Sequence, residues 1–221
     1  MLVNVDVKSL EWLVIVWFAQ DRVGMDEILK GIDQHSENQQ TFNLPDRTTA
    51  KIFVFRLIYG GSKWSYALDP DFNWISKKAD YWQEVIDKFY GKYKEIDKIH
   101  DKWVQEVTRT SRLVMPTGRI YTFLPYKDAS GGLRWPRTQI LNYPVQGTGH
   151  DIVTIARVSL WKRIKNEGLE TVKWLSTVHD SIVLDMPDDA GLLKRVVDIT
   201  HSVFNDIPDK FNKLFGVKFN L

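Results

Sequence analysis

Two aspartates that lie far apart in the sequence each sit beside an apolar run typical of a strand. Asp6 follows MLVNV, and Asp180 lies in LSTVHDSIVLDM, where two β-branched runs flank His179-Asp180-Ser181. The second stretch predicts a β-hairpin with this triplet at its tip. Taken singly, Asp6 is most simply a helix N-cap and Asp180 a turn residue. If the two strands pair in one sheet, the carboxylates could form a Mg²⁺ site suited to phosphoryl transfer.

A second set of chemically useful residues recurs every four positions in RTTAKIFVFRLIYGG. Arg47, Lys51, Phe55 and Tyr59 share one face of a predicted helix. The two cations lie toward the helix N-terminus, where an anion is favoured, and the two rings follow. This order predicts a nucleotide receptor, with phosphates at the cations and sugar and base against the rings. The alternative is an ordinary amphipathic helix with buried rings and snorkelling cations.

Composition and other motifs narrow the classes of protein. The 221 residues carry 30 Lys and Arg against 28 Asp and Glu, so any basic surface must be local. There is no cysteine and no H-x-x-x-H pattern, which argues against a zinc enzyme. GGSKWS at 60–65 lacks the upstream glycine of a phosphate loop and follows a helix, so we reject that interpretation. The apolar stretch LEWLVIVWFA is too short to span a bilayer.

Periodicity and turn residues predict mainly helices with a few strands. Asp46 is the predicted N-cap of the nucleotide helix, and a break is expected near Gly91 and another near Pro144. The expected elements are a strand at 1–5, helices at 9–20, 25–30, 34–42, 47–59 and 77–110, a loop-and-strand region around 116–132, a helix from 137 that resumes at 147–166, the hairpin at 175–186 and a last helix from 188 or 189 to 205.

In this order the segments resemble the three polymerase motifs of family A DNA polymerases, the DNA polymerase I family. DVKSLEWLVIVWFAQD resembles the first motif, and VHD resembles the third. RTTAKIFVFRLIYG matches R-x-x-x-K-x-x-x-F-x-x-x-Y-G, and NYPVQG is similar to N-x-P-x-Q-G. The resemblance runs from Val5 to about Phe219. It implies an α+β fold, in which a palm with a small antiparallel sheet (1–24 and 111–221) joins mainly helical fingers (25–110).

The resemblance also implies roles for the residues of the first and third motifs. Asp6 and Asp180 would be catalytic and would bind two Mg²⁺ ions, assisted by the backbone carbonyl of Val7. Glu11 would be a steric gate that excludes a ribose 2′-hydroxyl. The residues implied to contact primer–template DNA are Asn142, Gln146 and His179.

For the second motif the resemblance implies a binding site for dNTP. Asp33-Gln34-His35 resembles the D-x-H that precedes the nucleotide helix, so His35 would contact the triphosphate with Arg47 and Lys51. Lys51 would be catalytic as well if it protonates the leaving pyrophosphate. Phe55 would pack on the sugar, and Tyr59 would lie by the templating base.

Several positions depart from the family pattern. The family usually has Glu where Ser181 stands, Arg where Leu13 stands, Gly where Arg56 stands and Arg where Thr138 stands. The thumb, the preceding palm strands and an exonuclease are absent from this sequence, and GVKFNL is expected to stop before the closing strand. We therefore expect a second polypeptide that supplies the thumb and N-terminal palm, as in a split polymerase of a phage-type element in the bacterial cytoplasm.

The function implied is template-directed DNA synthesis by Mg²⁺-dependent nucleotidyl transfer from a dNTP to a primer 3′-hydroxyl. One alternative is a relative of single-subunit RNA polymerases, but Glu11 and Phe55 argue against it because that class tends to carry Gly and Met there. Another alternative is a non-catalytic nucleic-acid-binding remnant. Retention of both Asp6 and Asp180 argues against such a remnant, which gains nothing from the pair.

Overall fold

The computed structural model describes residues 1–217, so the expectation for GVKFNL falls largely outside the described residues. Helices dominate and the strands form small antiparallel sheets, which confirms the predicted α+β class. No helix in this part of the chain is long and apolar enough to cross a membrane. The elements in chain order are β1 (Leu2–Asp6), α1 (Leu10–Ala19), α2 (Arg22–Leu29), α3 (Gln34–Thr41), α4 (Arg47–Ile58), α5 (Lys63–Ala67), α6 (Pro70–Asn73), α7 (Ala79–Lys92), α8 (Lys94–Thr110), β2 (Arg112–Val114), β3 (Ile120–Thr122), β4 (Tyr126–Lys127), β5 (Leu133–Arg134), α9 (Arg137–Asn166), β6 (Lys173–Val178), β7 (Ser181–Asp185), α10 (Ala190–Asn205) and α11 (Ile207–Phe215).

Two compact units divide the chain. The first unit contains Met1–Val14, Pro116–Gly118 and the described residues from Gln146 onward. The second unit contains Ile15–Met115 and Arg119–Val145, so α1 and α9 contribute residues to both. The palm and fingers boundaries expected above are functional divisions and stay predictions.

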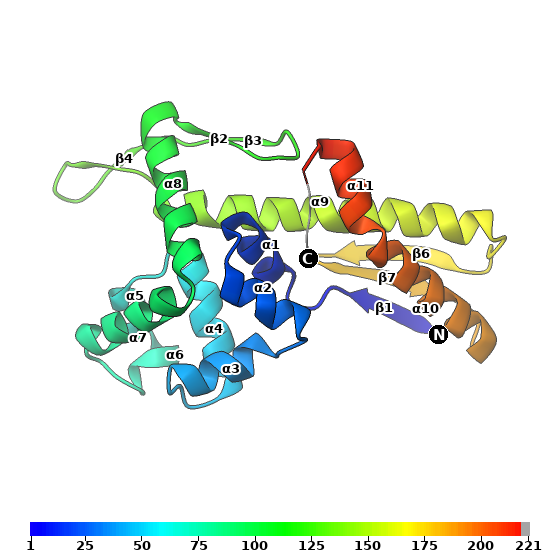
Figure 1. Ribbon diagram of the computed structural model, residues 1–221, viewed down its shortest axis with the longest axis horizontal. Coiled ribbons are helices and arrows are strands. Elements are labelled where there is room, and N and C mark those ends of the chain that lie inside the picture. The colour runs from blue at the N-terminus through cyan, green and yellow to red at the C-terminus, as the bar shows by residue number, and fades with distance from the viewer. Residues whose placement is uncertain (218–221) are drawn as a thin grey trace. The chain divides into compact units, whose positions relative to one another are not determined.

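The first unit is built on a three-stranded antiparallel sheet in the order β1-β7-β6, and Figure 1 shows its strands side by side. In the central strand β7, Ile182 and Leu184 are buried. The register pairs Asp6 of β1 with Ser181 of β7. The two predicted strand regions therefore do pair in one sheet, and their acidic residues lie at the same end of that sheet.

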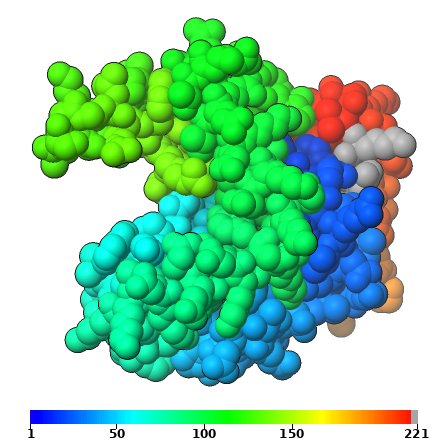
Figure 2. Space-filling view, turned by 60° about the vertical axis from the view of Figure 1, so that its left-hand side comes forward, coloured from blue at the N-terminus to red at the C-terminus, as the bar shows by residue number. Residues whose placement is uncertain are grey.

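The second unit buries a cluster of aromatic side chains around Phe53 of α4. Phe53 is fully buried, and its ring lies 5.0 Å from Tyr66 and 6.1 Å from Phe42. The Tyr66 hydroxyl also donates a hydrogen bond of 3.0 Å to the Phe53 carbonyl. Because this face of α4 is buried, the opposite face keeps Arg47 and Lys51 exposed. In Figure 2, residues from about 50 to 110, coloured cyan to green, cover a continuous side of this unit.

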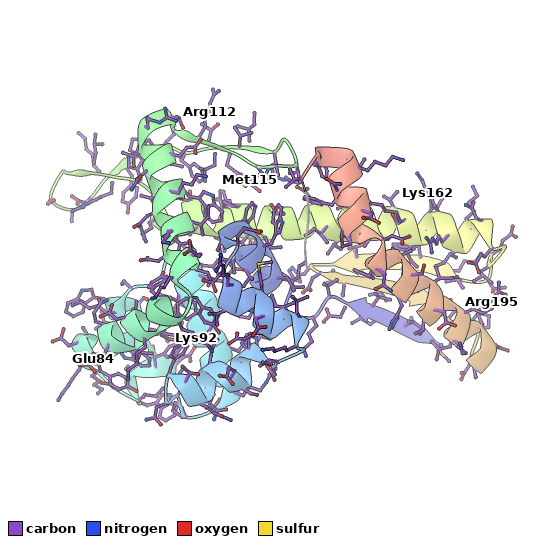
Figure 3. All side chains as sticks on the ribbon, in the orientation of Figure 1. Glu84, Lys92, Arg112, Met115, Lys162 and Arg195 are labelled. Atoms are coloured by element: carbon purple, nitrogen blue, oxygen red, sulfur yellow. The ribbon has the colours of Figure 1, made fainter. Side chains whose placement is uncertain are left out.

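One of the two predicted helix breaks is confirmed and the other is wrong. Helix α9 continues through Pro144 as one helix of 30 residues, so the predicted break there is wrong. The long helical segment does break near Gly91, at Tyr93 between α7 and α8. The buried Tyr93 hydroxyl lies 2.8 Å from a carboxylate oxygen of Glu27 and 2.8 Å from the side-chain oxygen of Asn38, and this hydrogen-bonded anchor fixes the break. Lys92 beside it, labelled in Figure 3, forms an ion pair of 2.8 Å with Glu27.

Capping explains most of the remaining differences. Helix α2 begins three residues earlier than predicted because Asp21 accepts hydrogen bonds from the backbone of Val23 and Gly24. The short helix α5, which was not predicted, begins at a capping box between Ser62 and Ser65. The rejected phosphate-loop motif is therefore a helix start, and helices α6 and α11 were likewise not predicted.

Candidate active site

The sheet register places the two predicted metal ligands at the same end of the pair of strands β1 and β7. Asp6 ends β1 and faces Ser181, and Asp180 is the residue immediately before Ser181. Opposed residues in an antiparallel pair have Cβ atoms about 4.5–5.5 Å apart, so Asp6 lies beside Ser181, the residue that follows Asp180. Ser9, not Asp6, directly precedes α1, so the N-cap interpretation of Asp6 is wrong.

The carboxylates of Asp6 and Asp180 are suited to holding Mg²⁺. Asp6 is exposed and Asp180 half-buried, and neither forms an ion pair or hydrogen bond with another residue of 1–217. Mg²⁺ commonly takes one or two protein carboxylates and completes its shell with water and phosphate oxygens. Val7 follows β1 directly and is half-buried, so its carbonyl lies next to Asp6 along the chain.

The tip of the hairpin is a tight turn formed by His179 and Asp180. Val178 and Ser181 pair across it, and His179 adopts a positive φ of 54°. The Ser181 hydroxyl donates 3.0 Å to the carbonyl of Val178 and is largely buried. The serine that replaces the family's glutamate thus closes the turn that holds Asp180.

A cavity of about 410 Å³ opens at this tip and collects four of the predicted residues. Its lining residues are Leu10, Glu11, Gln146, Gly149, His150, Val153, His179 and Asp180. The first turn of α1 comes close to α9 because Gly149 has no side chain. A Cβ there would lie 3.2–3.3 Å from Leu10 atoms. This approach brings Glu11 to the same cavity as Gln146.

His150 belongs to this cavity, although the sequence analysis did not single it out. It lies one helical turn after Gln146 on α9 and is exposed. The spacing from the N-x-P-x-Q-G motif was the signal that could have identified it.

In the second unit, Arg47 is already engaged by a carboxylate. Its Nε lies 2.6 Å from one oxygen of Asp33 and its Nη2 lies 3.2 Å from the other. Asp33 is also the N-cap of α3 and accepts a hydrogen bond from the backbone of His35. The hydrogen bonds from Arg47 are the main cause that holds the pKa of Asp33 well below its usual range.

The other predicted nucleotide contacts cluster around Phe55. The buried ring of His35 lies 5.5 Å from the Phe55 ring, and Lys51 Nζ lies 5.9 Å from the same ring. Asp46 accepts a hydrogen bond of 2.8 Å from the backbone of Thr49, which confirms it as the N-cap of α4. The predicted stripe therefore forms, with His35 of α3 beside it.

Tyr59 and Asn142 line a second cavity of about 910 Å³ in the same unit. Thr138, where the family has Arg, also lines it. Arg56, where the family has Gly, pairs with Asp69 at 2.9 Å and donates to the carbonyl of Ser65. This departure from the family pattern ties α4 to the helices that follow it.

Comparisons with known proteins agree with this arrangement. The model of DNA polymerase family A matches residues 1–212. The DNA polymerase I of Caldicellulosiruptor bescii is 23% identical over 207 residues, which are 89% of this chain and 24% of that protein. The DNA polymerase of Bacillus phage SP01 is 26% identical over 203 residues, 87% of this chain and 22% of that protein.

The fold also has a solved counterpart. The POL domain of Pol1 from M. smegmatis, in complex with DNA primer-template and dNTP, superposes with a TM-score of 0.78 at 18% identity. That match covers 93% of this chain and 36% of the other. The chain thus spans about a quarter of the curated relatives named here. Because the family model covers nearly the whole described sequence, the chain belongs to DNA polymerase family A.

Proposed function

We propose that this chain carries catalytic residues of a template-directed DNA polymerase that transfers a nucleotide from dNTP to a primer 3′-hydroxyl. The observation that carries the proposal is the pairing of Asp6 with Ser181, which puts Asp6 and Asp180 at one end of a sheet. Asp180 lines the cavity at the hairpin tip, and Asp6 lines a different cavity of the same unit. Two carboxylates without a protein partner at one end of a sheet are a donor set that phosphoryl transfer between nucleotides uses.

Asp6 and Asp180 would hold two Mg²⁺ ions, with the carbonyl of Val7 assisting. When bound, these ions make the 3′-hydroxyl more acidic and offset the charge that develops on the phosphates. His179 and Gln146 line the cavity beside Asp180, so they would contact the primer–template. Glu11 on the same cavity would close the space that a 2′-hydroxyl needs.

The residues of α4 and α3 would bind the incoming dNTP. Arg47, Lys51 and His35 would contact the triphosphate, and Lys51 would donate a proton to the leaving pyrophosphate. Phe55 would pack on the sugar. Tyr59 and Asn142, which share a cavity, would contact the templating side of the nascent pair. The solved relative that this fold matches holds primer–template and dNTP, which supports this choice of ligands.

A second polypeptide would complete the enzyme. The chain matches about a quarter of its curated relatives, so a partner that supplies the thumb and the N-terminal palm would restore the rest, and could also carry an exonuclease. A phage polymerase among the relatives supports a split enzyme that acts in the cytoplasm of a bacterial host.

The test is Mg²⁺-dependent incorporation of dNTP on a primer–template. The chain is assayed alone and then mixed with the polypeptide encoded upstream. Activity only in the mixture would support a split polymerase, and activity of the chain alone would support a polymerase that needs no partner. Failure of both preparations, with both proteins folded by circular dichroism, would refute the catalytic proposal and favour the nucleic-acid-binding alternative.

A further inference from the structure

One face of α9 carries a stripe of exposed and half-buried side chains that extends away from the cavity at the hairpin tip. At 100° per residue, positions 146, 150, 154, 157, 161 and 165 fall within an arc of about 100°. These residues are Gln146, His150, Thr154, Arg157, Trp161 and Lys165, and we call them the α9 stripe. At 1.5 Å per residue the stripe is about 28 Å long. None of its members is acidic.

The far end of the α9 stripe borders a groove of about 390 Å³. Arg157, Val158 and Trp161 line it from α9, and Trp174 lines it from β6. Trp161 is 49% exposed, which leaves part of its ring available to a ligand. Arg157 also reaches Thr177 of β6 at 3.5 Å, so side chains from both elements shape this region.

Positive charge flanks the exposed ring. Lys165 Nζ lies 5.2 Å from the centre of the Trp161 ring, and Arg157 lies one turn before it. Neither cation forms an ion pair with another residue of the described chain. By contrast, Arg163 on the same helix donates to Ser202 and Asp206 of the helical segment that follows. Arg157 and Lys165 therefore lack an acidic partner in the described chain, whereas Arg163 has one.

We propose that the α9 stripe and the Trp161–Trp174 groove bind a single strand of unpaired DNA. A cationic track with aromatic rings is how proteins hold single strands without reading sequence, because every base can stack on a ring. This inference rests on the proposed function, because Gln146 at one end of the α9 stripe is expected to contact primer–template. The inference adds a binding surface that lies outside the cavity at the hairpin tip.

The ligand is taken to be unpaired DNA because of the apolar character of the groove. Trp161 and Trp174 offer aromatic rings on which unpaired bases can stack, whereas the bases inside a duplex are held in their own stack and cannot reach them. A stripe about 28 Å long would accommodate several nucleotides. Binding should therefore depend on the length of the strand.

The experiment measures binding of labelled oligothymidylate to the full chain by fluorescence anisotropy, in low salt without Mg²⁺ or dNTP. A strand of about twelve nucleotides should bind, and one of about three should bind much more weakly, since it cannot span the stripe. Trp161→Ala should weaken binding of the long strand by about fivefold to a hundredfold, as loss of one stacked base predicts. Trp161→Phe should restore most of it.

Lys165→Ala and Lys162→Ala form the matched pair of charge variants. Lys162 lies about 100° around the helix from Trp161, and Figure 3 shows it on the side of α9 away from β6 and β7. Lys165→Ala should weaken binding several-fold and lower the slope of log affinity against log salt by about 0.7. Lys162→Ala, which removes the same charge from the same helix, should leave both quantities unchanged.

The proposal would be overturned if the wild-type chain did not bind the single strand, or if Trp161→Ala bound it as well as the wild type does. It would also be overturned if the two lysine variants lost affinity equally. A last contrary result would be that the stripe variants weaken the binding of duplex DNA but not of single strands. The outcome is separable from that of the proposed function. Loss of primer extension with intact stripe-dependent binding would remove the catalytic proposal alone. Normal extension with unaffected stripe variants would remove this inference alone.

Discussion

The carboxylates of the first unit and the cations of the second differ in how their charge is compensated. Asp6 and Asp180 have no ionic partner in the described chain, whereas Arg47 is held by both oxygens of Asp33. Under the proposed function, an added cation would supply the partner that the two carboxylates lack. A triphosphate would have to displace Asp33 to use Arg47 fully, because Arg47 is already paired.

The largest expected effect comes from the uncompensated pair. Asp180→Asn should lower Mg²⁺-dependent primer extension by at least about a hundredfold, because a metal site of this kind contributes several kcal/mol to the barrier. The measurement is single-nucleotide extension by the reconstituted enzyme, with unfolding curves to show that the fold is intact. Unchanged extension would exclude Asp180 as a metal ligand and would remove the basis of the comparison.

The second prediction concerns the loss of folding stability at acid pH that His100 of the second unit should cause. Burial, and then the nearby Arg137, lower the pKa of His100 in the second unit to about 3, from 6.5. The unfolded chain binds this proton more readily, so stability should fall as pH drops from about 6.5 toward 3, by about 2 kcal/mol at pH 5.

Urea unfolding at neutral pH and at pH 5 measures this loss, with His100→Gln as the comparison. The variant should lose most of the dependence on pH whatever its absolute stability. An equal dependence in both proteins would place the acid sensitivity elsewhere.

A third change sharpens the description of the cavity at the hairpin tip. Glu11→Ala should reduce discrimination against ribonucleotides by about tenfold to a hundredfold, because it opens the space that a 2′-hydroxyl needs. Glu11→Gln is the matched control, since it keeps the size of the side chain and removes the charge. If Gln behaves like Ala, the discrimination is electrostatic rather than steric. The measurement is the ratio of kcat/KM for dNTP and rNTP.

The smallest expected effect tests whether Asp33 competes with the triphosphate of dNTP for Arg47. Asp33→Asn should lower the KM for dNTP about twofold to fivefold with little change in kcat, because an exposed ion pair contributes about 0.2–1 kcal/mol. Asparagine is still a good N-cap, so α3 should persist. Asp46→Asn is the control, since Asp46 caps α4 without pairing with Arg47. A raised KM in Asp33→Asn would show that Asp33 positions Arg47 instead of competing for it.

The sequence was sufficient for features that depend on local pattern. The acidic ends of two strand-like runs, the four-residue repeat of α4 and the cap at Asp46 all follow from short-range chemistry. The pairing of Asp6 with Ser181 confirmed the expectation that those ends meet. The assigned roles of these residues remain predictions.

The features that the sequence did not reveal depend on tertiary contacts. Asp33 and Arg47 are 14 residues apart, and they meet only because α3 and α4 are neighbours. His150 reaches the cavity because Gly149 admits Leu10. Pro144 was expected to break its helix, a local rule that the surrounding packing overrides. The break near Gly91 was predicted, but its position at Tyr93 follows from hydrogen bonds to residues more than 50 positions away.

The candidate active site depends on the register of the pairing between β1 and β7. The two strands are five residues long each, and side chains alternate between the faces of a sheet. A slip of one residue would turn the Asp6 side chain to the opposite face without altering any amino acid of the site. A single residue inserted in β1 would therefore turn the Asp6 side chain to the other face of the sheet, although all the sequence motifs would remain unchanged.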